Sequence, residues 1–180
     1  MGASVLVVGD ALLDVLAAPS EPMRPGADVP AAVRVAPGGQ GANLAVRLAR
    51  RGVAVELVCA IAEDAAGRLL RESLAADGVR VHPRQAVATG TVIVLVDAAG
   101  ERTMLSQRVP LAGRLGDAPS ATADWLVVSG YLFLEPGAAS AARCHSSIDP
   151  SGTAQPTSIR RGASPCTAVA TRSAPASRSR

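Results

Sequence analysis

Short apolar runs recur along the first part of the chain. Residues 4–8 form a continuous, valine-rich run that Gly9 closes. This pattern is typical of a strand that is buried on both faces of a parallel sheet. Residues 53–60 and 124–129 repeat the pattern, and residues 79–83 are a shorter version. We therefore predict a strand in each of the four segments.

Helical periodicity fills two of the intervals between these runs. Residues 42–51 carry leucines four positions apart, and Gly52 follows them. Residues 65–77 carry a leucine stripe and are followed by Gly78. A glycine directly after an apolar stripe is typical of a helix end. Alternating strands and helices indicate an α/β fold with a mostly parallel sheet.

Three further β elements do not fit this alternation. Residues 29–35 favour a short edge strand. Residues 91–96 are β-branched and residues 101–106 return after the turn at 97–100, which predicts a hairpin. We expect these elements to form a separate, small sheet. No strand is predicted over residues 10–18, whose polarity is mixed.

Residues 141–180 have a different composition. They contain eight serines, six arginines and four prolines and no leucine, without helical or strand periodicity. Such a segment cannot bury enough apolar surface to offset its chain entropy. We predict a folded part over 1–140 and a disordered tail over 141–180. A reading-frame change and a natural basic tail would both explain the change of composition.

The charge of the chain excludes several kinds of site. All 18 basic residues are arginine, which excludes a phosphate-loop, Schiff-base or general-base lysine. Residues 1–140 hold 12 arginines and 14 acids, so the net charge of +3 comes from the tail. Aromatic residues number only three. A nucleic-acid-binding surface is therefore not expected.

The remaining composition favours a cytoplasmic protein. The three cysteines and two histidines lack the spacing of a disulfide framework or a metal site, so we expect no metal ligands. The amino end is apolar, but it lacks a positive segment and Asp10 and Asp14 interrupt it, unlike a signal peptide. No uncharged run is long enough to span a membrane.

A glycine-rich turn precedes the first predicted helix. Gly38, Gly39 and Gly41 would let the backbone approach a ligand closely, and the helix start offers free N–H groups. The amide of Asn43 could bind a hydroxyl group. A tight turn without any ligand is the alternative. The turn is not a dinucleotide fingerprint, because Leu44 stands where the third glycine would be.

Several motifs occur in the order found in one family. Residues 38–45 fit the pattern G-G-x-x-x-N-x-A, and residues 7–14 place Asp14 five positions after a glycine. Residues 62–67 resemble G-x-D-x-x-G, and residues 88–102 resemble a lid hairpin. Over roughly residues 4–140, the chain resembles the ribokinase-like (PfkB) carbohydrate kinases.

This resemblance implies a fold and a substrate. The implied fold is a mostly parallel central sheet flanked by helices, with a small β-sheet lid that closes over a sugar. The implied reaction transfers a phosphoryl group from ATP, with Mg²⁺, to a sugar hydroxyl. By position, Asp14, Gly38, Gly39 and Asn43 would contact the sugar. Tyr131 stands near a position where some ribokinases have a substrate-binding glutamate.

The second half of the family pattern does not occur in the sequence. The later signature D-T-x-G-A-G-D, which supplies the catalytic aspartate and an anion-binding helix start, is absent, as is the N-x-x-E motif. Phosphoryl transfer depends on groups placed around the transferring phosphate. We therefore expect a truncated, sugar-binding half that is inactive alone, without catalytic or ATP-binding residues of its own.

Two other functions agree with the same residues. One is a non-catalytic sugar or nucleoside sensor that retains Asp14 and the lid. The other is an interaction module, because exposed edge strands in a lid could pair two chains into a homodimer. The sequence does not indicate which sugar or nucleoside is bound.

Overall fold

The valine-rich runs build the larger of two sheets. The computed structural model describes residues 2–111, 123–130 and 169–172 of the chain. The strand order in the larger sheet is β5-β4-β1-β8-β9. The pairs β5–β4, β4–β1 and β1–β8 are parallel, and the pair β8–β9 is antiparallel. The bounds are β1 (Ser4–Val8), β4 (Ala54–Ile61), β5 (Arg80–Gln85), β8 (Trp125–Val128) and β9 (Val169–Arg172).

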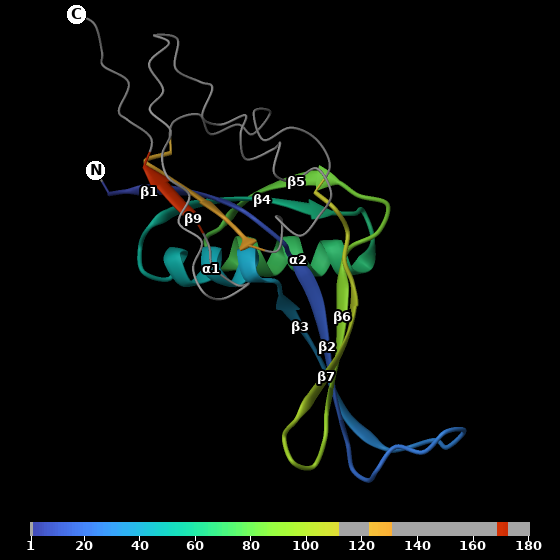
Figure 1. Ribbon diagram of the computed structural model, residues 1–180. Coiled ribbons are helices and arrows are strands. Elements are labelled where there is room, and N and C mark those ends of the chain that lie inside the picture. Colours follow the sequence, from blue (N-terminus) through green and yellow to red (C-terminus); the bar gives the residue numbers. More distant parts are fainter. Residues whose placement is uncertain (1, 112–122, 131–168, 173–180) are drawn as a thin grey trace, which may run out of the picture.

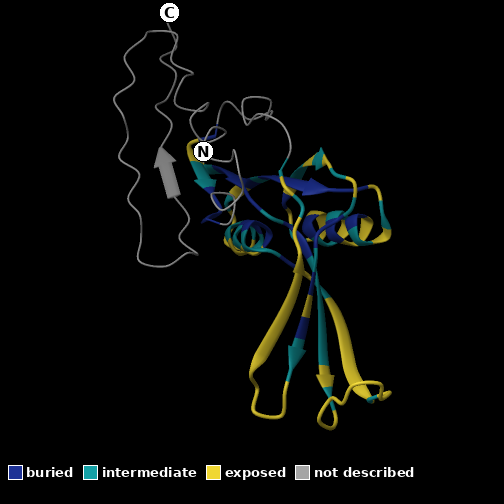
Figure 2. Cartoon of the chain, turned by 45° about the vertical axis from the view of Figure 1, so that its right-hand side comes forward, coloured by how far each residue is buried: buried dark blue, intermediate teal, exposed yellow. Residues whose placement is uncertain are grey.

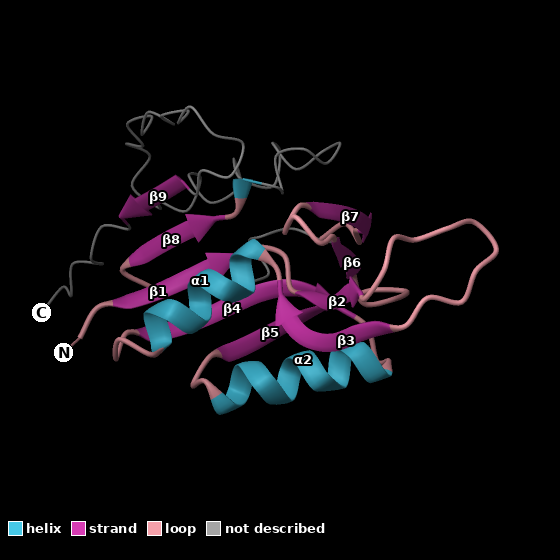
Figure 3. Ribbon diagram, turned by 90° about the horizontal axis from the view of Figure 1, so that it is seen from below, coloured by secondary structure: helices cyan, strands magenta, loops and turns pink. Residues whose placement is uncertain are grey.

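Two helices cover one face of this sheet, as Figure 3 shows. They are α1 (Gln40–Ala49) and α2 (Ala65–Ala76), close to the predicted ranges. Gly52 and Gly78, which follow the two helices, each adopt a φ of 79°. This left-handed conformation is strained for residues with a Cβ, so the two glycines end the helices as predicted.

Alternate residues of the central strands pack against opposite faces. On the helix-covered face, Val5 and Val7 pack with Leu57 of β4 and with residues of α1 and α2, Leu70 among them. On the opposite face, a smaller cluster contains Leu6, Val8, Val58, Ala123 and Val128. Because both faces of β1 are buried, its continuous apolar run needs no polar alternation.

The second sheet projects away from the first as a lid (Figure 1). Its strand order is β3-β2-β6-β7, with β2 and β6 parallel and both outer pairs antiparallel. The bounds are β2 (Leu12–Pro19), β3 (Ala31–Gly38), β6 (Thr91–Val96) and β7 (Arg102–Gln107). The predicted small sheet and its hairpin are confirmed.

One lid strand, β2, was not predicted. Leu12, Leu13, Asp14, Val15 and Leu16 show neither alternation nor a purely apolar run. In the structure Leu12 joins a small buried cluster with Val92 and Val94 of β6, and the other four residues are only half-buried. Figure 2 shows the contrast between the buried larger sheet and the mostly exposed lid. Without a fully buried face, a strand loses its period-2 pattern.

Most of the predicted disordered tail, residues 141–180, lies outside the described residues. Its one described segment, β9, is a strand and not coil. It pairs antiparallel with β8 over four residues, so β8 is not an unpaired sheet edge. The division of the chain at residue 140 stays a prediction. No helix in the described part of the chain is long and apolar enough to cross a membrane.

Candidate functional site

The candidate site lies where the larger sheet, the lid and α1 meet. Asp10 follows β1, and Ser129 follows the neighbouring parallel strand β8. Residues after the carboxyl ends of adjacent parallel strands meet at one edge of a sheet, where α/β proteins commonly bind ligands. The chain then enters the lid at Leu12 and returns through Gly38 to α1.

Asp10 binds the start of α1. The N–H groups of Gln40 and Gly41 donate to its two carboxylate oxygens at 3.1 and 3.3 Å. The Ser129 hydroxyl lies 3.1 Å from Oδ1 of Asp10 and 2.6 Å from Oε1 of Gln40. A carboxylate at this end of a helix satisfies otherwise unpaired donors and the helix dipole. The expectation of free N–H groups at Gln40 and Gly41 was therefore wrong.

Gly39 is the N-cap residue of α1. It has a φ of 99° and a ψ of 141°, a region open to glycine alone without strain. A Cβ at this position would also lie 2.6 Å from the carbonyl oxygen of Asp10. That same carbonyl accepts a hydrogen bond from the Ala42 N–H at 3.0 Å. Gly39 therefore lets the chain pass directly against the end of β1.

Asp14 and Gly38 touch each other in the lid. On β2 and β3, Leu12 pairs with Gly38 and Asp14 pairs with Ala36. A Cβ at Gly38 would overlap the Asp14 carboxylate, so a larger residue there would make the Asp14 side chain rotate away. The Asp14 side chain is half-buried, and none of the described residues forms a hydrogen bond with it.

The surroundings of Asp14 alter its ionisation. Burial raises the pKa of this carboxyl above its usual value, and the negative charge of Asp10 raises it further. Both effects disfavour the ionised form. A ligand that donates hydrogen bonds to Asp14 would offset them.

Asn43, another predicted site residue, is not joined to Asp14 by a hydrogen bond. Asn43 lies in the first turn of α1, where its N–H donates to the carbonyl of Gly39 at 2.9 Å. Its side chain is exposed, and no hydrogen bond joins it to the described part of the chain. Gly38 thus links Asp14 to the turn that carries Asn43. Tyr131 lies outside the described residues.

Sequence reasoning missed the roles of Asp10, Gln40 and Ser129. A signal existed, because Asp10 and Ser129 are polar residues at the ends of apolar runs that were each predicted as a strand. Their contact depends on β1 and β8 being adjacent. That adjacency joins segments 120 residues apart in the sequence, and no local pattern indicates it.

A small cavity lies beside this network. It has a volume of about 30 Å³ and is lined by Asp10 and Leu12, together with Ala60, Gly90 and Leu111 from other segments. This space suits about one water molecule and is too small for a sugar. It reaches Asp10 and not Asp14, so it does not define the whole site.

The described residues do not fit a magnesium nucleotide. No cluster of three His, Cys, Asp or Glu side chains occurs in the described ranges. Phosphates are commonly bound at helix starts, but Asp10 already accepts from the start of α1 and Asp64 accepts from the Gly67 N–H of α2. A phosphate at either place would meet a carboxylate.

The overlap at Gly38 gives a first prediction. Gly38→Ala is expected to destabilise the protein by about 0.5–1.5 kcal/mol, because its Cβ turns the Asp14 carboxylate out of its present rotamer. Urea unfolding would measure this loss. The double variant Gly38→Ala/Asp14→Ala removes the overlapping group and is expected to recover most of the stability. Purely additive effects would contradict the contact.

The raised pKa of Asp14 gives a second prediction. Since the folded state disfavours the Asp14 anion, Asp14→Asn is expected to raise the melting temperature at pH 7. The gain should shrink as the pH falls through the raised pKa and vanish near the usual carboxyl value of about 3.9, where wild type is also protonated. A gain that does not change with pH would contradict this origin.

Sequence comparison supports a carbohydrate kinase. The chain is 33% identical over 144 residues to a fructokinase from Klebsiella pneumoniae. The match includes 76% of this chain and 44% of the fructokinase. The chain therefore spans less than half the length of this relative.

Solved structures agree with this comparison. A ribokinase from Cryptococcus neoformans in complex with ADP is 28% identical, with a TM-score of 0.57 over 71% of this chain and 41% of its own. An Arabidopsis thaliana ribokinase complexed with ribose and ATP is 26% identical, with a TM-score of 0.52 over 61% of this chain and 37% of its own.

The sequence profile of the pfkB family carbohydrate kinases matches residues 3–166, which extends past the predicted boundary at residue 140. The two-sheet architecture and the ordered motifs agree with that match. The chain belongs to the pfkB family of carbohydrate kinases and has the ribokinase-like fold.

Proposed function

We propose that this chain carries the sugar-binding part of a pfkB-type carbohydrate kinase and that its ligand is a small sugar. The main observation in support is the Asp14 carboxylate, which is half-buried, lies against Gly38 and has no hydrogen-bond partner among the described residues. A desolvated polar group without a protein partner favours a ligand that can donate hydrogen bonds to it. Sugar hydroxyls are such donors.

The amide of Asn43 completes the proposed contacts. It can donate and accept a hydrogen bond at the same time, which suits a hydroxyl group. Gly38 and Gly39 would let the sugar approach the backbone closely. The role of Tyr131 as a further contact stays a prediction, as does a cytoplasmic location.

We further propose that the chain does not transfer phosphate alone. One similar ribokinase structure contains ADP and another contains ribose and ATP. These complexes support ATP as the phosphate donor of the family. In the described residues, carboxylates occupy both helix starts, and the D-T-x-G-A-G-D signature does not occur in the sequence. The catalytic base and the site for Mg²⁺ and ATP would then come from residues that this sequence does not contain.

Calorimetry with ribose and fructose tests the sugar site. Wild type is expected to release or absorb heat with at least one of these sugars. Asp14→Ala is expected to weaken binding about 10- to 100-fold, the effect of losing about 1.5–3 kcal/mol in a hydrogen bond to a charged group. Asp28→Ala is the matched control, because Asp28 is an exposed carboxylate elsewhere in the lid.

Two outcomes would contradict the proposal. Equal affinities of wild type and Asp14→Ala would remove Asp14 from the site. Steady phosphorylation of a sugar when the chain is supplied with MgATP would show that it is a complete kinase. Binding without turnover agrees with a sugar-binding half and also with a non-catalytic sensor.

The lid also supports a proposal about assembly. Val15 of β2 pairs with Val35 of β3 and Ile93 of β6, and Ile93 pairs with Leu105 of β7. These four form an apolar row on the lid face opposite Asp14. Three of them, Val35, Ile93 and Leu105, are exposed large hydrophobic residues. We propose that this row is covered by the same row of a second copy.

Leu105→Glu tests this assembly. The variant is expected to shift the chain from dimer to monomer in size-exclusion chromatography with light scattering, because it places a charge inside the interface. Met104→Glu is the matched control, since Met104 is the preceding residue on β7, faces the other side and is similarly exposed, at 62% against 56%. A wild-type monomer at high protein concentration would contradict the proposal.

A further inference from the structure

The lid joins the rest of the protein at a small number of places. Strand β2 begins two residues after Asp10, and β6 begins directly after Thr89 and Gly90. The two strands are connected at this point, because the Leu13 N–H donates to the carbonyl of Gly90 at 2.9 Å. The position of β2 therefore depends on how the first residues of β6 are held.

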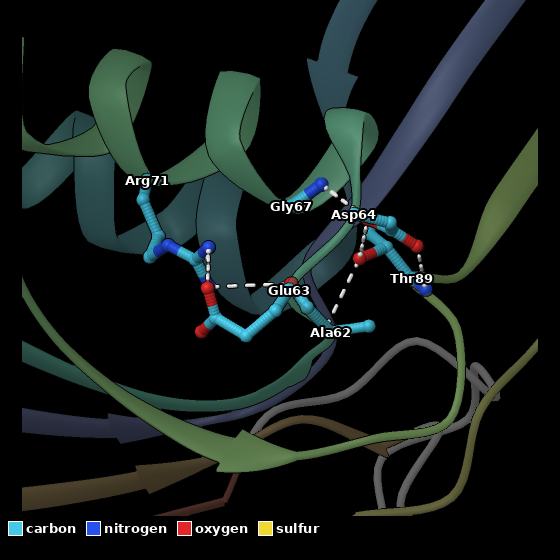
Figure 4. A network of polar contacts seen from close by, with 6 residues as sticks. All are labelled: Ala62, Glu63, Asp64, Gly67, Arg71 and Thr89. Atoms are coloured by element: carbon cyan, nitrogen blue, oxygen red, sulfur yellow. Dashed lines mark hydrogen bonds and ion pairs between the residues drawn. The ribbon is translucent and has the colours of Figure 1, made fainter.

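Thr89 is bound on two sides. It is only 3% exposed, although it stands at the start of a lid strand. Its hydroxyl accepts from the Ala62 N–H at 3.1 Å and donates to Oδ1 of Asp64 at 2.7 Å. Its own N–H donates to Oδ2 of Asp64 at 2.8 Å (Figure 4). Thr89 thus joins the end of β4 to the start of α2.

Asp64 has two tasks in this arrangement. As the N-cap residue of α2 it accepts from the Gly67 N–H at 2.7 Å. Its hydrogen bonds with Thr89 and Gly67 lower the pKa of the carboxyl, so it is ionised at neutral pH. A helix cap needs only the bond with Gly67. The two bonds with Thr89 hold a segment 25 residues away.

Close packing leaves this contact little freedom. A Cβ at Gly67 would overlap the carbonyl oxygen of Ala62 and would lie 2.9 Å from the Thr89 hydroxyl. The carbonyl of Ala62 also accepts from Arg71 of α2 at 3.2 Å. Figure 4 shows these groups gathered around the first turn of α2. Thr89 therefore cannot shift without disturbing the helix start.

We propose that Asp64 and Thr89 are a positioning pair that fixes the lid and, through it, the Asp14 carboxylate. Asp14 pairs with Val92 on β6, three residues after Thr89. The parallel pairing transmits the position of β6 to β2. This inference rests on the proposed sugar site only for its effect on binding. The anchoring of the lid can be tested without any ligand.

Asp64→Asn and Thr89→Val are the test variants. Asparagine is as good an N-cap as aspartate, so the Gly67 bond and α2 are retained. With its one acceptor oxygen kept toward the Gly67 N–H, its NH2 group faces the Thr89 N–H, and that hydrogen bond is lost. Thr89→Val removes the hydroxyl at nearly constant volume, and Thr89→Ser should restore the contact.

The matched control is Thr91→Val. Thr91 is also a threonine at the start of β6, but its hydroxyl forms only a long 3.4 Å contact with the Thr89 carbonyl. This variant removes a hydroxyl from the same strand and leaves the Asp64 contact intact. It should behave as wild type.

Hydrogen exchange is the first readout. In both test variants we expect the amide of Leu13 on β2 to exchange at least about tenfold faster, with unchanged exchange in α1. A role limited to capping α2 would not alter Leu13, which lies in another sheet. Sugar affinity is the second readout and should fall about tenfold or more, with recovery in Thr89→Ser.

Each outcome decides a separate point. Unchanged exchange at Leu13 in both test variants would overturn the anchoring role. Faster exchange with unchanged sugar affinity would overturn the positioning of Asp14. If wild type binds no sugar while Leu13 exchanges faster in the variants, the proposed function fails and the anchoring role is supported.

Discussion

The carboxylate of Asp10 at the start of α1 is the interaction on which the site depends. It follows β1, accepts from Gln40 and Gly41 of the helix, and contacts Ser129 after β8. Two strands of the larger sheet and one helix are thus joined by a single side chain. The lid leaves and re-enters the fold beside the same group. Any change in its position would move the glycine turn and β2 together.

Asp14 differs from Asp10 although it is only four residues away. Asp10 accepts from two backbone N–H groups and contacts the Ser129 hydroxyl, whereas no described residue bonds to the side chain of Asp14. Burial and the charge of Asp10 raise the pKa of Asp14. A protein that needed only stability would not keep a second, unpaired carboxylate here, because such groups cost free energy. The cost agrees with the proposed role of Asp14 as a ligand-binding residue.

The sequence predicted the fold where its hydrophobic pattern is periodic or continuously apolar. Strands β1, β4 and β8 and both helices follow from apolar runs, leucine stripes and terminal glycines, because the core imposes a period on them. It failed at β2, where neither lid face is fully covered. For the site, the glycine turn was predictable from its composition. The binding of α1 by Asp10 was not, because it depends on the adjacency of β1 and β8.

Both helix starts use the same arrangement. Asp10 and Asp64 each accept from the first turn of a helix, and each is next to the first residues of a lid strand, β2 or β6. Each carboxylate therefore couples the stability of a helix to the placement of the lid. Since both helices pack on the core of the larger sheet, the lid gains a rigid base beside its own small buried cluster of Leu12, Val92 and Val94. This explains how a sheet with exposed faces can hold Asp14 against Gly38.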